Sequence, residues 1–388
     1  MDQDAHGWSI QQQYFRGAER QSGSLSRLQK KWLEYKSPFY FYRSQDTVAH
    51  PPVFLETDSP GWPLTLTHYL ITGASGFVGQ AMIGKLMAEN DEKRDKISGV
   101  VRRPLPENSR LKQFVLADMN ADTDWLPYLN RIDVVFHLAA RVHIMHAVSS
   151  DALDAFQRIN WRATVRLAEQ AAACGVRRFV YVSSIKVNGE YTSRGHTFSE
   201  ADSASPQDPY ALSKWQAEQS LMEISARTGM ELVIARPPLV YGAGVKANLL
   251  SLMRLIDKGI PLPFGGIHNK RSLLYIGNLV DALLQCANHE HAAGKTFLLS
   301  DAYAVSTPEL CQCIAHSLGR PLRLVNIHPA LLSSLAGLVG KSSVVDRLTQ
   351  SLEVDNSKIC RELSWSPPYS IEQGFYKTAE WFRSAYNK

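Results

Sequence analysis

Residues 68–79 read His68-Tyr-Leu-Ile-Thr-Gly-Ala-Ser-Gly-Phe-Val-Gly79, and this stretch decides the fold. Its first five residues predict a short buried strand, and the pattern over 80–88 predicts a helix. The three glycines between them suit a dinucleotide site, because they allow a tight turn, close approach to a pyrophosphate and helix–sheet packing. An ordinary strand-to-helix turn is the alternative, but the strand before and the helix after favour the dinucleotide site.

Working outward, the same alternation of apolar runs and helical patterns continues to about residue 240. It predicts an α/β fold with a doubly wound parallel sheet covered by helices on both faces. The ligands of such a fold lie at the carboxyl ends of its strands. Strands are expected at 68–72, 97–101, 114–117, 134–138, 178–182, 231–235 and 297–300, and helices at 80–88, 153–173, 210–228 and 249–257.

The composition excludes several classes of protein. The chain has 388 residues and a net charge of +5 without a long basic block, so nucleic-acid binding is not suggested. It has five cysteines, an odd number, and the spacing of Cys311 and Cys313 is not that of a metal knuckle. We therefore expect no metal site, thiols in a reducing compartment, and a cytoplasmic protein.

No apolar run is long enough for an integral membrane segment, which needs roughly 18 residues. The longest candidate, 331–339, predicts a core or interfacial helix that could touch a membrane surface, and no secretory leader is visible. Residues 1–66 differ from the rest, with a polar start, an aromatic group and a proline-bearing tract. They form an N-terminal extension: a poorly ordered or docking arm, or the product of an over-extended reading frame.

Tyr210 and Lys214 form a second anchor, because a spacing of four places both side chains on one face of the helix predicted at 210–228. A phenol with an ordinary pKa near 10 is a poor proton shuttle at pH 7. We expect the neighbouring ammonium of Lys214 and a positively charged nicotinamide ring to favour the phenolate and lower that pKa. An accidental pair on a helix is the alternative, but the Ser183-Ser184 strand end before it favours a catalytic role.

The Gly-x-x-Gly-x-x-Gly spacing, the Tyr-x-x-x-Lys pair and the Ser183-Ser184 strand end together resemble the extended short-chain dehydrogenase/reductase superfamily. The closest resemblance, over about 68–388, is to its NAD(P)-dependent nucleotide-sugar epimerase/dehydratase family, which is similar to UDP-glucose 4-epimerase. This implies a Rossmann-type domain at 67–240, joined by 271–300, and a smaller C-terminal substrate-binding lobe from 241–270 and 301–388. It also implies catalytic roles for Ser184, Tyr210 and Lys214, and a homodimer formed through the Tyr210 helix and its neighbour.

The resemblance implies which residues bind the cofactor. Asp118 corresponds to an acid that bonds the adenine amino group, and Asn160 to a helix residue that supports the active-site water or backbone. The full set is Gly73, Ser75, Gly76, Phe77, Val78, Gly79, Arg102, Asp118, Met119, Leu138, Ala139, Ala140, Tyr210 and Lys214.

The substrate residues implied are Ser184, for the reacting oxygen, with Asn248 and Arg271 for the diphosphate of a nucleotide sugar. Residues 262–264 resemble the strand beside the nucleotide base. Two positions depart from the family pattern: Asn188 replaces a tyrosine expected at the mouth of the substrate pocket, and Leu239 replaces an asparagine that contacts the sugar nucleotide. The identity of the sugar stays open.

The second predicted strand ends in Arg102 and Arg103 rather than in the acid that would bond the ribose of NAD. These arginines favour NADP slightly, or stack on adenine, or face solvent, so the cofactor is NAD(P). The activity implied is a nucleotide-sugar 4-epimerase (UDP-hexose or UDP-N-acetylhexosamine) acting through a 4-keto intermediate, in surface-polysaccharide precursor synthesis. An NAD(P)H-dependent 4-keto-sugar-nucleotide reductase and a non-catalytic nucleotide-sensing protein are the alternatives.

Overall fold

The computed structural model describes residues 67–89, 95–142, 149–328, 331 and 348–386. All of them fall within one compact unit, Thr65–Lys388. The predicted extension at 1–66 and the apolar run at 331–339, apart from Leu331, lie outside the described residues. Within the described part of the chain, no helix has the length and apolar character to cross a membrane.

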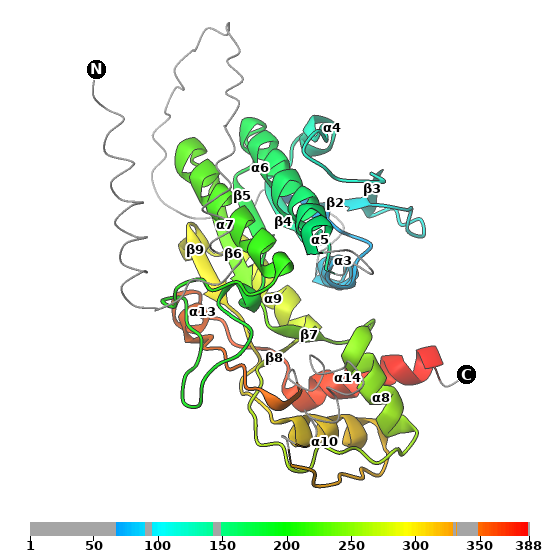
Figure 1. Ribbon diagram of the computed structural model, residues 1–388. Coiled ribbons are helices and arrows are strands. Elements are labelled where there is room, and N and C mark those ends of the chain that lie inside the picture. The colour runs from blue at the N-terminus through cyan, green and yellow to red at the C-terminus, as the bar shows by residue number, and fades with distance from the viewer. Residues whose placement is uncertain (1–66, 90–94, 143–148, 329–330, 332–347, 387–388) are drawn as a thin grey trace, which may run out of the picture. The chain divides into compact units, whose positions relative to one another are not determined.

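The centre of the fold is a seven-stranded sheet in the order β3-β2-β1-β4-β5-β6-β9, with every neighbouring pair parallel (Figure 1). The chain leaves β1 on one side through β2 and β3 and returns to its other side with β4. The strands are β1 (Thr67–Thr72), β2 (Asp95–Val101), β3 (Leu111–Val115), β4 (Val134–His137), β5 (Arg178–Val182), β6 (Glu231–Arg236) and β9 (Lys295–Leu298).

Both faces of the sheet are buried, because successive strand residues enter two different hydrophobic cores. Tyr69 and Ile71 of β1 pack in one core with α3 (Phe77–Glu89) and α9 (Ile276–Asn288). Leu70, between them, packs in the other core with α6 (Ala163–Ala173) and α7 (Pro209–Thr228). Figure 1 shows α6 and α7 side by side along one face. The predicted Rossmann-type, doubly wound parallel sheet is confirmed.

Three predicted elements need correction, and one is the last strand of the sheet, which is Lys295–Leu298 and not 297–300. The third strand is Leu111–Val115, not 114–117, because its register with β2 pairs Leu111 with Ile97. The prediction was based on apolar residues and so left out the polar residues Lys112 and Gln113, which an edge strand tolerates. The single helix predicted at 153–173 is three pieces: α5 (Ser149–Phe156), a π-helical turn (Gln157–Arg162) and α6. The wider turn inserts its extra residue into the ladder, and this places Asn160 in the interior.

The chain leaves the main sheet after β6 and pairs β7 (Leu239–Tyr241) with β8 (Leu273–Tyr275) in a small parallel sheet. It then returns through α9 to β9. Isolated bridges tie the remaining loops, such as Arg271 to both Val305 and Leu352. The other helices are α4 (Leu126–Leu129), α8 (Ala247–Asp257), α10 (Thr307–Leu318), α13 (Ser357–Glu362) and α14 (Ile371–Tyr386), with 3-10 turns at Ile185–Val187 and Glu290–Ala292.

Candidate active site

The first feature of the site is the point where the strand order reverses, between β1 and β4. In open α/β sheets, ligands bind in the crevice at the carboxyl ends of the strands at this point. Gly73 ends β1 with a left-handed φ of 68°, and a Cβ atom there would lie only 2.8 Å from the backbone N of Ala139, just past β4. The two chain segments therefore touch backbone to backbone.

The other two glycines let α3 begin directly above this contact. A Cβ atom at Gly79 would lie 2.3 Å from the carbonyl oxygen of Gly73, and Gly76 N donates to the same oxygen over 2.8 Å. The turn therefore has no room for a Cβ atom at Gly73 or Gly79. The amino end of α3, which is the positive end of the helix dipole, faces the crevice. These residues fit the pyrophosphate of a dinucleotide. The predicted Ser75, Phe77 and Val78 line the same turn and are partly exposed.

A buried chain of hydrogen bonds runs under this glycine turn. Thr72 Oγ1 accepts from Ala139 N over 3.3 Å and lies 2.7 Å from His137 Nδ1. His137 Nε2 lies 2.8 Å from Thr164 Oγ1, and Thr164 donates to the carbonyl of Asn160 over 2.9 Å. Burial lowers the pKa of His137 to about 3, with a smaller lowering from Lys214, so the imidazole stays neutral. Since Thr164 donates onward, the imidazole donates from Nε2 and accepts at Nδ1.

Asn160 extends this chain to the catalytic helix. Its Oδ1 accepts from Arg141 N over 2.8 Å, and its Nδ2 donates to Arg141 O and Ser213 Oγ over 3.0 and 3.1 Å. Ser213 in turn donates to the carbonyl of Tyr210 over 2.7 Å. The π-helical turn thus joins the loop after β4 to the first turn of α7, consistent with the backbone support expected of Asn160.

The structure brings the three predicted catalytic residues together at the carboxyl end of β5. The Ser184 side chain lies close enough to the Tyr210 hydroxyl to lower the pKa of that phenol. Lys214, one helical turn on, is buried, donates to the carbonyl of Val182 over 2.7 Å and lies 4.4 Å from the centroid of the Tyr181 ring. The Tyr210 ring also packs edge-on against Phe156. Two hydroxyls and an amine thus converge beside the strand end.

The groups of the chain alone raise the pKa of Tyr210 rather than lower it, and the lowering expected with a nicotinamide ring stays a prediction. Burial, and next the charge of Asp208, raise the pKa of Tyr210 to about 12, against a lowering by Ser184. Burial also lowers the pKa of Lys214 to about 7, although Glu218 opposes that shift. Sequence spacing could not predict this, because it gives proximity but not the desolvation of either group.

The sequence predicted that Asn188 would lie at the mouth of a pocket, and the structure instead places this side chain in the interior. It is buried, and its Oδ1 accepts from Arg236 Nη1 over 2.9 Å while its amide donates to Ser199 O over 3.1 Å. Arg236 also forms a buried bidentate pair with Glu218 of α7, with 3.0 Å from Nε to Oε1. Asn188 therefore joins the structural tie between β6 and α7.

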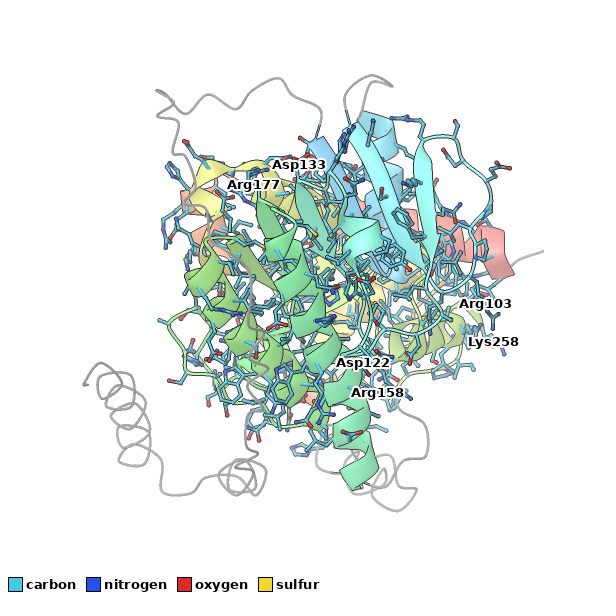
Figure 2. The ribbon with its side chains drawn as sticks, turned by 90° about the horizontal axis from the view of Figure 1, so that it is seen from above. Arg103, Asp122, Asp133, Arg158, Arg177 and Lys258 are labelled. Atoms are coloured by element: carbon cyan, nitrogen blue, oxygen red, sulfur yellow. The ribbon has the colours of Figure 1, made fainter. Side chains whose placement is uncertain are left out.

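The residues predicted to surround the adenine end are more exposed. Arg102 and Arg103 follow β2 at the surface, and Figure 2 shows Arg103 at the periphery. Asp118 is exposed and lies 3.9 Å from Arg158, a distance that makes a weak ion pair. Three predicted residues are partly exposed near the carboxyl ends of β3 and β4: Met119, Leu138 and Ala140.

The predicted substrate residues lie on two separate elements. Asn248 is exposed in the first turn of α8, next to Ala247, whose φ of 56° is uncommon outside glycine. The half-buried Arg271 donates to the carbonyl of Gln350 over 3.0 Å. Thr349 and Ser351, on either side of Gln350, line a pocket of about 650 Å³. Its other lining residues are 265–269 and 326–328.

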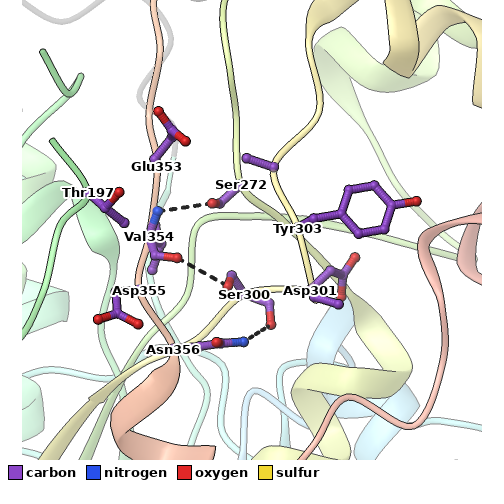
Figure 3. Close-up of a pocket in the computed structure, with 11 residues that line it drawn as sticks. Thr197, Ser272, Ser300, Asp301, Tyr303, Glu353, Val354, Asp355 and Asn356 are labelled. Atoms are coloured by element: carbon purple, nitrogen blue, oxygen red, sulfur yellow. Dashed lines mark hydrogen bonds between the residues drawn. The ribbon is translucent and has the colours of Figure 1, made fainter. Parts of the chain in front are cut away.

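A second pocket, of about 410 Å³, lies beyond the carboxyl end of β9 and contains none of the predicted catalytic residues (Figure 3). Its walls bond to one another: Val354 N donates to Ser272 Oγ over 3.0 Å, and Asn356 Nδ2 donates to Ser300 O over 2.9 Å. The buried Asp301 accepts from Tyr241, Tyr275 N and Asn278. This pocket is a polar joint between loops. In the described part of the chain, no cluster of His, Cys, Asp or Glu could hold a metal ion.

Sequence reasoning missed two charged residues beside Tyr210, namely Lys186 and Asp208. Lys186 Nζ lies 2.7 Å from an oxygen of Asp208 and 2.7 Å from one of Glu190. An Asp-Pro-Tyr sequence at 208–210 is a recognisable helix start, with an N-cap before a proline, and could have identified Asp208. Nothing in the sequence indicated that Lys186 would reach it.

The comparisons with known proteins agree with this geometry. Residues 69–300 match the family described as the NAD dependent epimerase/dehydratase family. The chain is 43% identical over 320 residues to the UDP-glucose 4-epimerase of Vibrio cholerae, covering 82% of this chain and 96% of that protein.

Two solved structures are similar throughout the described unit. MoeE5, in complex with UDP-glucose and NAD, is 25% identical with a TM-score of 0.63, over 82% of this chain and 99% of that one. The UDP-glucose 4-epimerase of Thermotoga maritima, with UDP-glucose, is 20% identical with a TM-score of 0.65, over 82% and 99% of the two chains, which supports the fold alone.

Proposed function

This chain belongs to the NAD dependent epimerase/dehydratase family of extended short-chain dehydrogenases/reductases, and within that family we propose that it is a nucleotide-sugar 4-epimerase. It is an NAD-dependent enzyme of the epimerase/oxidoreductase type. Our proposed substrate is a UDP-hexose or UDP-N-acetylhexosamine, inverted at C4 through a 4-keto intermediate to provide precursors of surface polysaccharide. The similarity to the Vibrio cholerae UDP-glucose 4-epimerase, over nearly its whole length, supports this choice.

The single observation that carries the proposal is the convergence of Ser184, Tyr210 and Lys214 at the carboxyl end of β5, on the same edge of the parallel sheet as the glycine turn after β1. Tyr210 takes the proton of the C4 hydroxyl and later returns it, while Ser184 hydrogen-bonds the same oxygen. Bound NAD supplies the acceptor and donor of the C4 hydride, and the positive charge of its oxidised ring favours the Tyr210 phenolate. Lys214, with a pKa of about 7, is partly protonated at neutral pH and adds to that charge.

Our proposed position of the cofactor rests on the glycine turn at 73–79 and not on the residues predicted at the adenine end. Gly73, Gly76 and Gly79 present backbone amides and the α3 dipole to the pyrophosphate. NAD is the cofactor in the family description and in the related MoeE5 complex, so our proposal is NAD.

We place the nucleotide of the substrate at the 650 Å³ pocket. The segment 262–264 directly precedes the lining residue Gly265, and Arg271 donates to the carbonyl of Gln350, which stands between the lining residues Thr349 and Ser351, so both predicted segments border this pocket. Arg271 suits paired phosphate oxygens, because its planar guanidinium can donate two parallel hydrogen bonds. Asn248, at the amino end of α8, is proposed for the same diphosphate.

The decisive experiment incubates the purified protein with a panel of UDP-sugars, with and without NAD(P)H, and follows the configuration at C4 by NMR. Net inversion without added cofactor supports the epimerase. Stoichiometric consumption of NAD(P)H with a 4-keto sugar replaces it with the 4-keto-sugar reductase. Absence of turnover on every sugar, with retention of nucleotide binding, leaves the non-catalytic sensing protein.

Location and assembly are part of the same proposal. All five cysteines of the chain are free thiols, two of them fully buried, which fits a reducing compartment such as the cytoplasm. We propose a homodimer formed through α6 and α7, where Met222 is an exposed apolar residue. Light scattering of wild type and Met222→Glu tests the dimer, since a charge at a buried interface would shift the protein toward monomer.

A further inference from the structure

The turn that carries Ser184 is joined to the helix that carries Tyr210 by one lysine. Ser184 caps the 3-10 turn Ile185–Val187, and its Oγ accepts from Lys186 N over 3.3 Å. The Lys186 side chain then crosses to the amino end of α7, where Nζ lies 2.7 Å from Asp208 Oδ2. The same ammonium lies 2.7 Å from Glu190 Oε1.

Asp208 uses its two oxygens for two tasks. Oδ1 accepts from Ala211 N over 2.7 Å and so caps α7, while Oδ2 receives the Lys186 ammonium. Tyr210 is two residues beyond this cap. Any movement of the Ser184 turn relative to the start of α7 must therefore break the contact between Lys186 and Asp208 or carry both elements together.

We propose that Lys186 is a positioning residue, whose ammonium holds the Ser184 and Tyr210 hydroxyls in register by tying their two elements together at Asp208. The inference rests on the proposed function, because it assigns the two hydroxyls to one reacting oxygen. Misplacement by about 1 Å can reduce turnover about 100-fold, so a tie of this kind can matter to catalysis far more than to stability.

Lys186 also compensates a charge beside the phenol. The groups around Tyr210 are Asp208 on its own helix, Ser184, Lys186 and Glu190 on the facing turn, Lys214 and Glu218 further along α7, and Tyr181 on β5. The anionic Asp208 raises the pKa of Tyr210. Removal of the Lys186 cation therefore raises this pKa further, whereas removal of the Asp208 charge lowers it.

The test uses four variants, each assayed over pH with the UDP-sugar that the panel identifies. Lys186→Met removes the charge and keeps the stem, and Lys186→Arg restores a cation. Asp208→Asn removes the charge but keeps an N-cap acceptor. Lys295→Met is the matched control, because the pair of Lys295 with Glu362 has the same 2.7 Å separation and similar exposure but lies at the amino end of β9.

For Lys186→Met we expect a kcat about 10- to 100-fold below wild type, a KM within about threefold, and an unfolding midpoint within about 3 °C. Lys186→Arg recovers kcat to within about fivefold, and Lys295→Met matches wild type. The acidic limb of the pH profile, which reports deprotonation of Tyr210, moves to higher pH in Lys186→Met and to lower pH in Asp208→Asn. Equal turnover of Lys186→Met and wild type overturns the proposal. So does a shift of the acidic limb in the same direction in Lys186→Met and Asp208→Asn.

A crystal structure of Lys186→Met gives a readout that does not depend on turnover. The proposal requires the separation of the Ser184 and Tyr210 hydroxyls to differ from that in a wild-type crystal structure, and an unchanged separation rejects the proposal. If wild type turns over no sugar at all, the proposed function fails on its own, and this structure still decides the role of Lys186.

Discussion

Within the one compact unit, the candidate residues before Tyr241, the first part of the described chain, are held differently from those after it, the second part. Before it, the candidate catalytic groups sit at the ends of parallel strands and helices, tied by buried hydrogen bonds such as those of His137 and Asn160. After it, Asn248 is exposed and the half-buried Arg271 is tied through loop segments. The first part is fixed by strand ends and buried hydrogen bonds, whereas the second presents its side chains from the exposed first turn of α8 and from loops.

This contrast separates chemistry from recognition. Regular strands and helices hold atoms within the tolerance that proton transfer requires, and loops can change their side chains without disturbing that arrangement. Substitutions in the first part should therefore change turnover or cofactor binding, and those in the second should change substrate affinity. Four experiments test that division.

The largest effect is expected from Tyr210→Phe in the first part. Loss of the proton-shuttling hydroxyl should lower kcat about 1,000-fold, equal to about 4 kcal/mol, with little change in KM. Tyr191→Phe is the matched control, because Tyr191 is 58% exposed. Steady-state kinetics measure both variants, and more than a tenth of wild-type turnover in Tyr210→Phe contradicts the catalytic role.

Glycine-to-alanine substitutions compare the two parts directly. At Gly79 the new Cβ lies 2.3 Å from backbone oxygen, so we expect about 100-fold weaker NAD binding, equal to about 2.8 kcal/mol. At Gly265 the nearest atom, at 2.2 Å, is the side-chain oxygen of Asn326, which can rotate away, so the change in NAD binding should be less than about twofold. Calorimetry with NAD measures both, and equal losses would refute the contrast.

The pH dependence of stability tests the buried chain at His137. The folded protein keeps this imidazole neutral with a pKa of about 3, against 6.5 when unfolded. The unfolded chain therefore binds the extra proton between these values, and His137 makes the free energy of unfolding fall as the pH falls below 6.5. The loss attributable to His137 is about 2 kcal/mol at pH 5.

Urea titrations of wild type and His137→Asn at pH 7 and pH 5 measure this effect. The variant is less stable at pH 7, because the chain from Thr72 to Thr164 is interrupted, but its stability should change less with pH. Identical pH slopes in the two proteins would show that His137 is not held neutral.

The smallest effect is expected from Arg271→Ala in the second part. Loss of one guanidinium from the diphosphate should raise the KM for the UDP-sugar about tenfold, equal to about 1.4 kcal/mol, with kcat within about threefold. Arg271→Lys should recover only part of this, because an ammonium cannot form the bidentate contact. A fall in kcat at constant KM would place Arg271 with the catalytic group instead.

The predictability of each feature follows the same division. The bounds of β5 (Arg178–Val182), the glycine turn and the Tyr210–Lys214 spacing were readable, because period and spacing are local properties of the chain. The π-helical turn was not readable, since its cause lies in bonds from Asn160 to residues distant in sequence.

The side chains that contact other elements were the least predictable. Asn188 was expected at a pocket mouth. The family pattern could not reveal that its amide oxygen accepts a buried hydrogen bond from Arg236. The high pKa of Tyr210 depends on burial, which no spacing encodes. In these cases the deciding quantity is created only when separate segments fold together.

The late arrival of β9 has a consequence for synthesis of the protein. Its partner β6 ends at Arg236, and β9 begins only at Lys295. At translation rates of about 5 to 20 residues per second, about 60 residues take roughly 3 to 12 s to emerge. Throughout that interval the nascent sheet has an unpaired edge at β6. Because unpaired edges promote aggregation, a chaperone would protect the chain most in this interval.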